Sequence, residues 1–109
     1  VILAGVKLSL HALFSGTAQL PDIALEPPGK VICSVTEDSL QAGAIYGAAA
    51  MADGLLERME EELGQPCTAV ATGGLSGIIT PYCRRRIRHD DSLLLRGLAL
   101  IWRKNCGNR

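Results

Sequence analysis

The chain contains few aromatic residues and no excess of charge. Only 4 % of its 109 residues are Phe, Trp or Tyr, whereas 48 % are hydrophobic, so a core must be built mainly from Ala, Leu, Ile and Val. Eleven Lys and Arg residues balance eleven Asp and Glu residues, which gives a formal net charge of zero. A chain without net positive charge is not expected to bind nucleic acid or a membrane surface by general electrostatic attraction. Its one basic run, Arg84–Arg86 with Arg88, is expected to lie in a solvated loop or at a strand edge.

The sequence also lacks any pair of cysteines with the Cys-x-x-Cys spacing. Its four cysteines, Cys33, Cys67, Cys83 and Cys106, lie far apart along the chain. This spacing argues against a zinc site and against a disulfide framework, and it favours a reducing, cytoplasmic setting. Cys67 falls in a predicted buried strand, where we expect it to be a small core residue.

No secretory signal and no membrane span are visible. The hydrophobic part of the helix predicted after Leu40 is interrupted by Gln41 and Asp53, so it is not the apolar run that a membrane span needs. The length suits about one small domain. Because the sequence starts with Val1 inside an apolar run, we expect it to be part of a longer chain.

The most informative segment is a predicted buried strand, residues 67–71, followed directly by Thr72, Gly73 and Gly74. Glycine has no Cβ, so a flat ligand can lie against the backbone there. Ligands of open α/β sheets bind beyond the carboxyl ends of the strands, and the first amides of a following helix favour anions. The segment is therefore a candidate nucleotide site. A tight turn without a ligand is the alternative, because short glycine motifs are common.

The hydrophobic pattern predicts strands alternating with helices, which is typical of an α/β fold. Strands are predicted at residues 1–4, 23–25, 67–71 and 87–89, and helices at residues 6–14, 36–63, 75–80 and 93–105. Asp90, Asp91 and Ser92 are alternative N-caps for the last helix. We find no internal repeat and no linker.

The long helix at residues 36–63 is the largest predicted element. Thr36 is its expected N-cap, and Gly64 is its expected C-terminal stop. Its expected inward stripe consists of Leu40, Ala44, Gly47, Met51, Leu55, Met59 and Leu63. Glycines and alanines make the first half thin, so it can pack closely against the rest of the chain or, alternatively, against a second subunit.

The order of these elements and a set of short motifs resemble the C-terminal half of a type III pantothenate kinase. The motifs are Gly5, Thr17-Ala18-x-Leu20-Pro21, Thr36, Ser39, Gly43, Thr72-Gly73-Gly74 and Leu95-x-Gly97-Leu98. The resemblance covers almost the whole chain. It implies the ribonuclease-H-like half of the acetate and sugar kinase, Hsp70 and actin fold, truncated at its N-terminus. Residues 1–109 would then be a C-terminal domain fragment that binds pantothenate and adenosine.

The resemblance also implies an activity, which is ATP-dependent phosphorylation of pantothenate to 4'-phosphopantothenate, the first step of coenzyme A biosynthesis. Mg²⁺ would accompany ATP, and a monovalent cation, K⁺ or NH₄⁺, would be needed. The partners would be these small molecules and a second copy of the chain, with no nucleic acid and no membrane. Thr17 would contact pantothenate, although a turn cap is the alternative from the residue alone. Thr72, Gly73 and Gly74 would form part of the adenosine site.

Four positions depart from the family pattern. The usual Ile-Gly-x-Asn-Thr segment is Ile-Cys-Ser-Val-Thr, so Cys33 and Val35 replace the glycine and the asparagine. Ala4 stands where proline is usual, and Leu94 stands where threonine is usual. The chain could therefore be a divergent enzyme or a non-catalytic binding or regulatory module that kept the kinase fold. An unrelated helix-rich interaction domain is a third possibility.

No catalytic residue and no metal ligand are assigned. The acidic, glycine-rich loops that the family uses for phosphoryl transfer are not present in this sequence. We expect catalysis to come from residues before Val1 and residues 1–109 alone to be inactive. His11 is expected to be an ordinary surface or core histidine. His89 and Asp90 could form a catalytic pair, but no Ser or Cys is spaced along the sequence to complete it.

Overall fold

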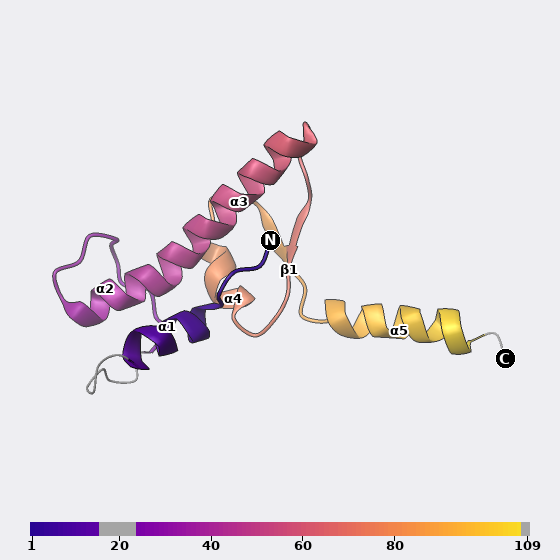
Figure 1. Ribbon diagram of the computed structural model, residues 1–109, viewed down its shortest axis with the longest axis horizontal. Helices are drawn as coiled ribbons and strands as arrows, with labels where there is room; N and C mark the ends of the chain where they lie inside the picture. The colour runs from indigo at the N-terminus through magenta and orange to yellow at the C-terminus, as the bar shows by residue number, and fades with distance from the viewer. Residues whose placement is uncertain (16–23, 108–109) are drawn as a thin grey trace.

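The fold is given by a computed structural model that describes residues 1–15 and 24–107. The described residues combine helices with one small parallel sheet, so the chain is an α/β protein (Figure 1). In chain order the elements are α1 (Val6–Ser15), α2 (Thr36–Ala42), the π-helical η1 (Gly43–Gly47), α3 (Ala48–Leu63), β1 (Ala69–Ala71), α4 (Ser76–Ile79), the 3₁₀-helical η2 (Thr80–Tyr82), β2 (Ile87–His89) and α5 (Leu93–Cys106).

The long predicted helix is confirmed. Elements α2, η1 and α3 run on without a break from Thr36 to Leu63 (Figure 1). Gly64 ends the helix with φ +70°, and its N–H donates to the Glu60 carbonyl at 2.8 Å, as expected for a left-handed C-cap. The predicted N-cap is wrong by one residue: Val35 occupies that position, and the Ser39 hydroxyl donates to the Val35 carbonyl at 2.9 Å.

The sheet consists of β1 and β2, which run parallel with Ala69 opposite Ile87 and Ala71 opposite His89. The strand predicted at residues 87–89 is confirmed. The strand predicted at residues 67–71 is shorter than expected and not buried, because within the described residues only β2 lies beside it. Cys67 is exposed in the connection before β1, so the prediction that it is a core residue is wrong.

Two other strand predictions are not confirmed. Residues 1–4 form no strand, and the side chains of Val1 and Ile2 are 85 % and 99 % exposed. A strand requires a neighbour that pairs with its backbone amides and carbonyls, and no described segment pairs with residues 1–4. Residues 24–28 have no regular structure, while Ile23 of the predicted edge strand lies outside the described residues.

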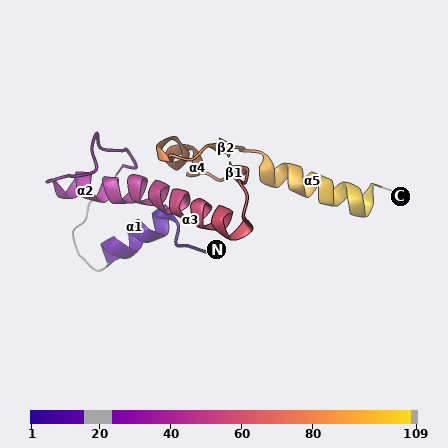
Figure 2. The same cartoon turned by 90° about the horizontal axis from the view of Figure 1, so that it is seen from above.

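The core is small and is centred on η1. Ile45 is fully buried, and Leu10, Ala42 and Ala49 are also buried. Element η1 contacts both α1 and α4, which lie on opposite sides of the long helix (Figure 2). These contacts bury the first half of the helix and leave its second half largely without apolar cover.

The expected inward stripe of the long helix is therefore wrong over much of its length. Met51, Met59 and Leu63 are 48 %, 37 % and 61 % exposed. A spacing of three to four residues identifies an apolar stripe, but the length over which neighbours cover that stripe depends on where those neighbours pack.

The second half of the long helix holds the sheet through two carboxylates. Asp53 accepts the backbone N–H groups of Arg84 and Arg85 at 2.8 and 3.0 Å. Glu60 accepts the backbone N–H of Cys67 at 3.0 Å and also forms an ion pair with Arg85. The segments that lead into β1 and into β2 are thus both fixed to α3. In the basic run, which was expected in a solvated loop or at a strand edge, Arg84–Arg86 precede β2 and Arg88 lies within it. Arg85 is partly buried against α3, and the other three arginines are exposed.

All four cysteines are free thiols. Cys83 is half-buried, with its Sγ 3.8 Å from the Ala49 carbonyl and 3.7 Å from the Ile79 carbonyl. Burial, and then the negative charge of Asp53, raise the pKa of the Cys83 thiol above its usual value of 9.0. The thiol therefore stays protonated at neutral pH and is a poor nucleophile.

The last helix, α5, projects away from the other elements (Figures 1 and 2). Its first turn is fixed by Asp90, which accepts the N–H and the hydroxyl of Ser92 and forms an ion pair with Arg96. Its apolar side chains Leu94, Leu95, Leu98, Ile101 and Trp102 are all more than half exposed. Among the helices of residues 1–15 and 24–107, none has both the length and the apolar character needed to cross a membrane.

We predict that Glu60→Gln destabilises the protein in a pH-dependent way. The N–H of Cys67, and then the guanidinium of Arg85, lower the pKa of the Glu60 carboxyl below its usual value of 4.5. A lowered folded-state pKa adds stability above the unfolded-state pKa, and that stability is lost as the pH falls through the folded-state pKa. The difference in unfolding free energy between wild type and Glu60→Gln should therefore be largest near neutral pH and shrink below about pH 4.5.

Denaturant unfolding at a series of pH values measures this difference. The neighbouring Glu61→Gln is the matched control, because Glu61 is exposed on the same turn and makes neither of the two contacts of Glu60. Equal pH profiles for the two variants would contradict the role of Glu60.

Candidate functional site

The candidate site is the loop that joins β1 to α4. β1 ends at Ala71, and Thr72, Gly73 and Gly74 follow it as exposed residues. Gly73 has φ +106°, a conformation that side-chain-bearing residues rarely adopt. An added Cβ at Gly73 or Gly74 would meet nothing within 4 Å, so the backbone is open to a ligand.

A cavity of about 590 Å³ lies against this loop. It is lined by Thr72, Gly73, Gly74, Gly77, His89, Asp91 and Leu94. The volume is in the range of small-molecule sites, and the cavity lies at the carboxyl ends of β1 and β2, where parallel sheets bind ligands. The structure therefore brings the three predicted residues together in an open corner, while their contact with a nucleotide remains a prediction.

A second cavity, of about 480 Å³, lies between the N-terminal segment, α1, the long helix and α4. Ala44, Met51 and Leu55 of the expected inward stripe line it, together with Gly5 and Thr72. The stripe thus faces a cavity rather than a core. Thr17, the residue expected to bind pantothenate, lies outside the described residues.

Two of the positions that depart from the family pattern, Cys33 and Val35, lie beside α2. Cys33 lines a third cavity, of about 510 Å³, together with Ser39 and Tyr46. Its Sγ donates to the Lys30 carbonyl at 3.2 Å. Val35, at the N-cap position of α2, is 57 % exposed.

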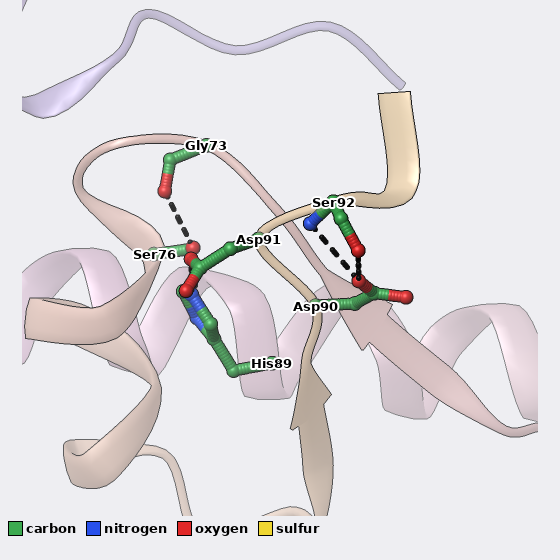
Figure 3. A network of polar contacts seen from close by, with 6 residues as sticks. All are labelled: Gly73, Ser76, His89, Asp90, Asp91 and Ser92. Atoms are coloured by element: carbon green, nitrogen blue, oxygen red, sulfur yellow. Dashed lines mark hydrogen bonds and ion pairs between the residues drawn. The ribbon is translucent and has the colours of Figure 1, made fainter. Parts of the chain in front are cut away.

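A chain of polar contacts closes one side of the Thr72–Gly74 loop (Figure 3). The Ser76 hydroxyl donates to the Gly73 carbonyl at 2.8 Å, and Ser76 Oγ lies 3.0 Å from His89 Nδ1. The other ring nitrogen of His89, Nε2, contacts the Asp91 carboxylate. The catalytic pair of His89 and Asp90 that the sequence suggested is not formed, because the Asp90 carboxylate binds Ser92 and Arg96 instead.

Sequence reasoning missed Ser76, because it lies 13 residues before His89. The signal that could have found it is the parallel pairing of residues 69–71 with residues 87–89. This pairing sets the start of the helix after the first strand beside the end of the second strand.

Ser76, His89 and Asp91 are the residue types of a nucleophilic catalytic triad, but their arrangement does not activate the serine. The serine proton is directed at Gly73, and the Asp91 side chain is 87 % exposed, so it does not fix the imidazole from a buried position. The N–H of Ser76 donates to the Gly73 carbonyl, and those of Ile78 and Ile79 donate to the Leu75 carbonyl. These amides are therefore not free for an oxyanion. The expectation that the start of the helix attracts anions stays a prediction, and α4 is short, with only four residues.

The acidic residues do not form a metal centre in the part of the chain that the structure describes. Within residues 1–15 and 24–107, no three His, Cys, Asp or Glu side chains are grouped so that they could hold a metal ion. Asp91 is the one carboxylate in the lining of the 590 Å³ cavity, and it is in contact with His89. These residues do not fit a site for Mg²⁺, which needs oxygen ligands in near-octahedral geometry.

A parallel strand pair with an open glycine loop and a cavity at its carboxyl end is typical of α/β proteins that bind small molecules. Comparison with known proteins narrows this class. The family model of type III pantothenate kinase matches residues 1–58. The chain belongs to the type III pantothenate kinase family.

Curated relatives agree with this assignment over nearly the whole chain. The type III pantothenate kinase of Frankia alni is 43 % identical over 105 residues, which cover 96 % of this chain and 42 % of that protein. The type III pantothenate kinase of Solibacter usitatus is 42 % identical over 95 % of this chain and 40 % of its own length. That of Koribacter versatilis is 42 % identical over 99 % of this chain and 39 % of its own. The chain spans about two fifths of the length of these relatives.

We predict that Gly73→Ala lowers the unfolding free energy by about 1–3 kcal/mol, because alanine is strained at a positive φ. Gly74→Ala is the matched control, since Gly74 is adjacent, has equal free space and has no positive φ. It should leave stability unchanged or raise it by up to about 1 kcal/mol. Chemical denaturation measures both variants, and equal losses would contradict the strained turn.

Proposed function

We propose that this chain is the nucleotide- and pantothenate-binding part of an enzyme that phosphorylates pantothenate with ATP. The product is 4'-phosphopantothenate, in the first step of coenzyme A biosynthesis. The observation that carries the proposal is the identity of 42–43 % to proteins named type III pantothenate kinase over almost the full length of the chain. Residues 1–109 would be the C-terminal domain, with the ribonuclease-H-like core of the acetate and sugar kinase superfamily.

The adenosine of ATP would lie on the Thr72–Gly74 loop. The peptide planes at Gly73 and Gly74 are open, so a flat purine can approach them closely. Leu94 supplies an apolar wall on the α5 side of the same cavity. The Thr72 hydroxyl can both donate and accept a hydrogen bond, which suits a nucleoside. Pantothenate would contact Thr17.

Catalysis would use residues beyond those in this chain. Phosphoryl transfer needs Mg²⁺ to neutralise charge on the phosphates and a carboxylate to orient the attacking hydroxyl. Because the described residues do not fit a Mg²⁺ site, we assign neither Mg²⁺ nor the monovalent cation, K⁺ or NH₄⁺, to ligands in this chain. We place the reaction in the cytoplasm, since free thiols such as the four described cysteines persist in a reducing compartment.

The test is ATP-dependent phosphorylation of pantothenate by the full protein, followed through ADP release. Thr72→Val removes the hydroxyl at constant shape and should raise the KM for ATP about 2- to 10-fold, the value of one hydrogen bond, with a smaller effect on pantothenate. Thr68→Val, before β1, is the matched control and should leave both KM values unchanged. Residues 1–109 alone should give no turnover.

The outcomes separate the proposal from its alternative. Turnover that depends on Thr72 supports the kinase. Saturable binding of ATP and pantothenate without turnover by the full protein supports a binding module instead. No binding of either ligand rejects both.

We also propose that the protein forms a homodimer. The exposed apolar side chains of α5 offer a hydrophobic surface of the kind that subunit contacts bury. Sedimentation equilibrium of the full protein should give twice the mass of one chain at micromolar concentration. A mass equal to one chain at that concentration would reject the homodimer.

A further inference from the structure

The hydrogen bonds around Ser76 require a particular protonation state of His89, because each hydrogen bond needs one proton. A carbonyl oxygen and a carboxylate only accept hydrogen bonds, so Ser76 must donate to Gly73, and His89 Nε2 must carry a proton toward Asp91. A serine hydroxyl has one proton. Once that proton is directed at Gly73, the 3.0 Å contact between Ser76 Oγ and His89 Nδ1 is a hydrogen bond only if Nδ1 is also protonated. All three contacts are therefore satisfied together only by the imidazolium form.

We propose that Ser76, His89 and Asp91 are positioning residues for the Thr72–Gly74 loop, and that this network is complete when His89 is charged. The inference rests on the proposed function in one respect, since it takes the loop to be the surface on which adenosine lies. Beyond the proposed function, we infer that His89 of β2 and Asp91 after it stabilise the loop in a pH-dependent way.

The anchor of the network is the Gly73 carbonyl, at the residue with φ +106°. Ser76 holds this oxygen twice, through its hydroxyl at 2.8 Å and its backbone N–H at 3.3 Å. When His89 is neutral with its proton on Nε2, Nδ1 becomes a second acceptor that competes with Gly73 for the Ser76 hydroxyl. Deprotonation of His89 thus weakens one of the two bonds that fix the turn.

Contacts with α4 and with the end of β1 hold the His89 ring beside Ser76. The ring lies against α4 at Gly77, where an added Cβ would be 3.4 Å from the ring Cε1. This is an ordinary van der Waals distance, so α4 packs directly beside the ring at this position. The end of β2 is tied to the same corner from the other side, since the N–H of Asp90 donates to the Ala71 carbonyl at 2.8 Å.

Among residues 1–15 and 24–107, few charges face the His89 ring. Asp91 contacts it directly, and the neighbouring Asp90 is paired with Arg96 of α5. Residues 76–79 of α4 include no ionisable side chain. Arg88 precedes His89 on β2, where successive side chains point to opposite faces of the sheet. Asp91 is thus the charged group that interacts with the imidazolium.

The first test needs no ligand. ¹H–¹⁵N NMR of the full protein would follow the amide signals of Gly73 and Gly74 and the ring nitrogens of His89 from pH 5 to pH 8, where histidines change charge. Both glycine signals should titrate with the same midpoint as the His89 ring. In Ser76→Ala and in His89→Gln their pH dependence should fall to that of Gly54 on α3, whereas Ser76→Thr, which keeps the hydroxyl, should retain it.

His11→Gln, a substitution of an exposed histidine on α1, is the matched control and should leave the glycine titration unchanged. The network is rejected if the glycine signals do not follow His89 in the wild type, or if they titrate equally in Ser76→Ala. A Ser76→Ala protein that does not fold is replaced by the His89→Gln comparison, which uses the same signals.

The second test measures positioning of the nucleoside. Adenosine serves as the probe, because it has no phosphate that ionises in this pH range. Its dissociation constant should be about 2- to 10-fold lower at pH 6 than at pH 8 in the wild type, the value of one hydrogen bond, and equal at both pH values in Ser76→Ala. Binding with the same pH dependence in both proteins rejects the positioning role and leaves the nucleotide site intact. Failure of adenosine to bind at either pH rejects the nucleotide site, whereas the glycine titration still decides whether the network couples His89 to the loop.

Discussion

The parallel pairing of β1 with β2 is the constraint on which the site depends. It aligns Ala71 with His89, so the loop after one strand and the segment after the other meet at one edge of the sheet. Each strand has only three residues, and a pair this short is marginal in water by itself. Asp53 and Glu60 of α3 supply the missing support, because they accept backbone N–H groups in the segments that precede both strands. The acidic face of the long helix therefore fixes the geometry of a loop that it does not itself form.

The support around this site is polar rather than hydrophobic. Ile45 and its buried neighbours bring α1 and α4 against η1, but the apolar core does not extend to the sheet or to α5. A largely exposed strand pair and an apolar helix that projects into solvent are surfaces that proteins usually cover. The proposed contact with a second copy of the chain would cover the apolar side chains of α5.

Much of the secondary structure could be predicted from the sequence, because the signals are local. Gly64 ends the long helix through its own left-handed backbone, and residues 87–89 read as a strand from their pattern and their flanking residues. The open corner at residues 72–74 was also expected. Burial was predicted poorly: Cys67 and Met59 are in apolar patterns, yet no described element covers them. The hydrophobic spacing in a sequence shows which face of a helix or strand is apolar. Whether that face is buried depends on a neighbouring element, which the spacing does not identify.

The sequence alone determined where the long helix stops and that an open turn follows residue 71, since backbone conformation at a turn depends on the residues in it. Only the tertiary structure decided which side chains meet there. Ser76 reaches His89 across 13 residues, and Asp53 reaches the N–H of Arg84 across 31. Contacts at such separations exist because strand pairing and helix packing set the distances between segments, and no local spacing along the chain contains that information.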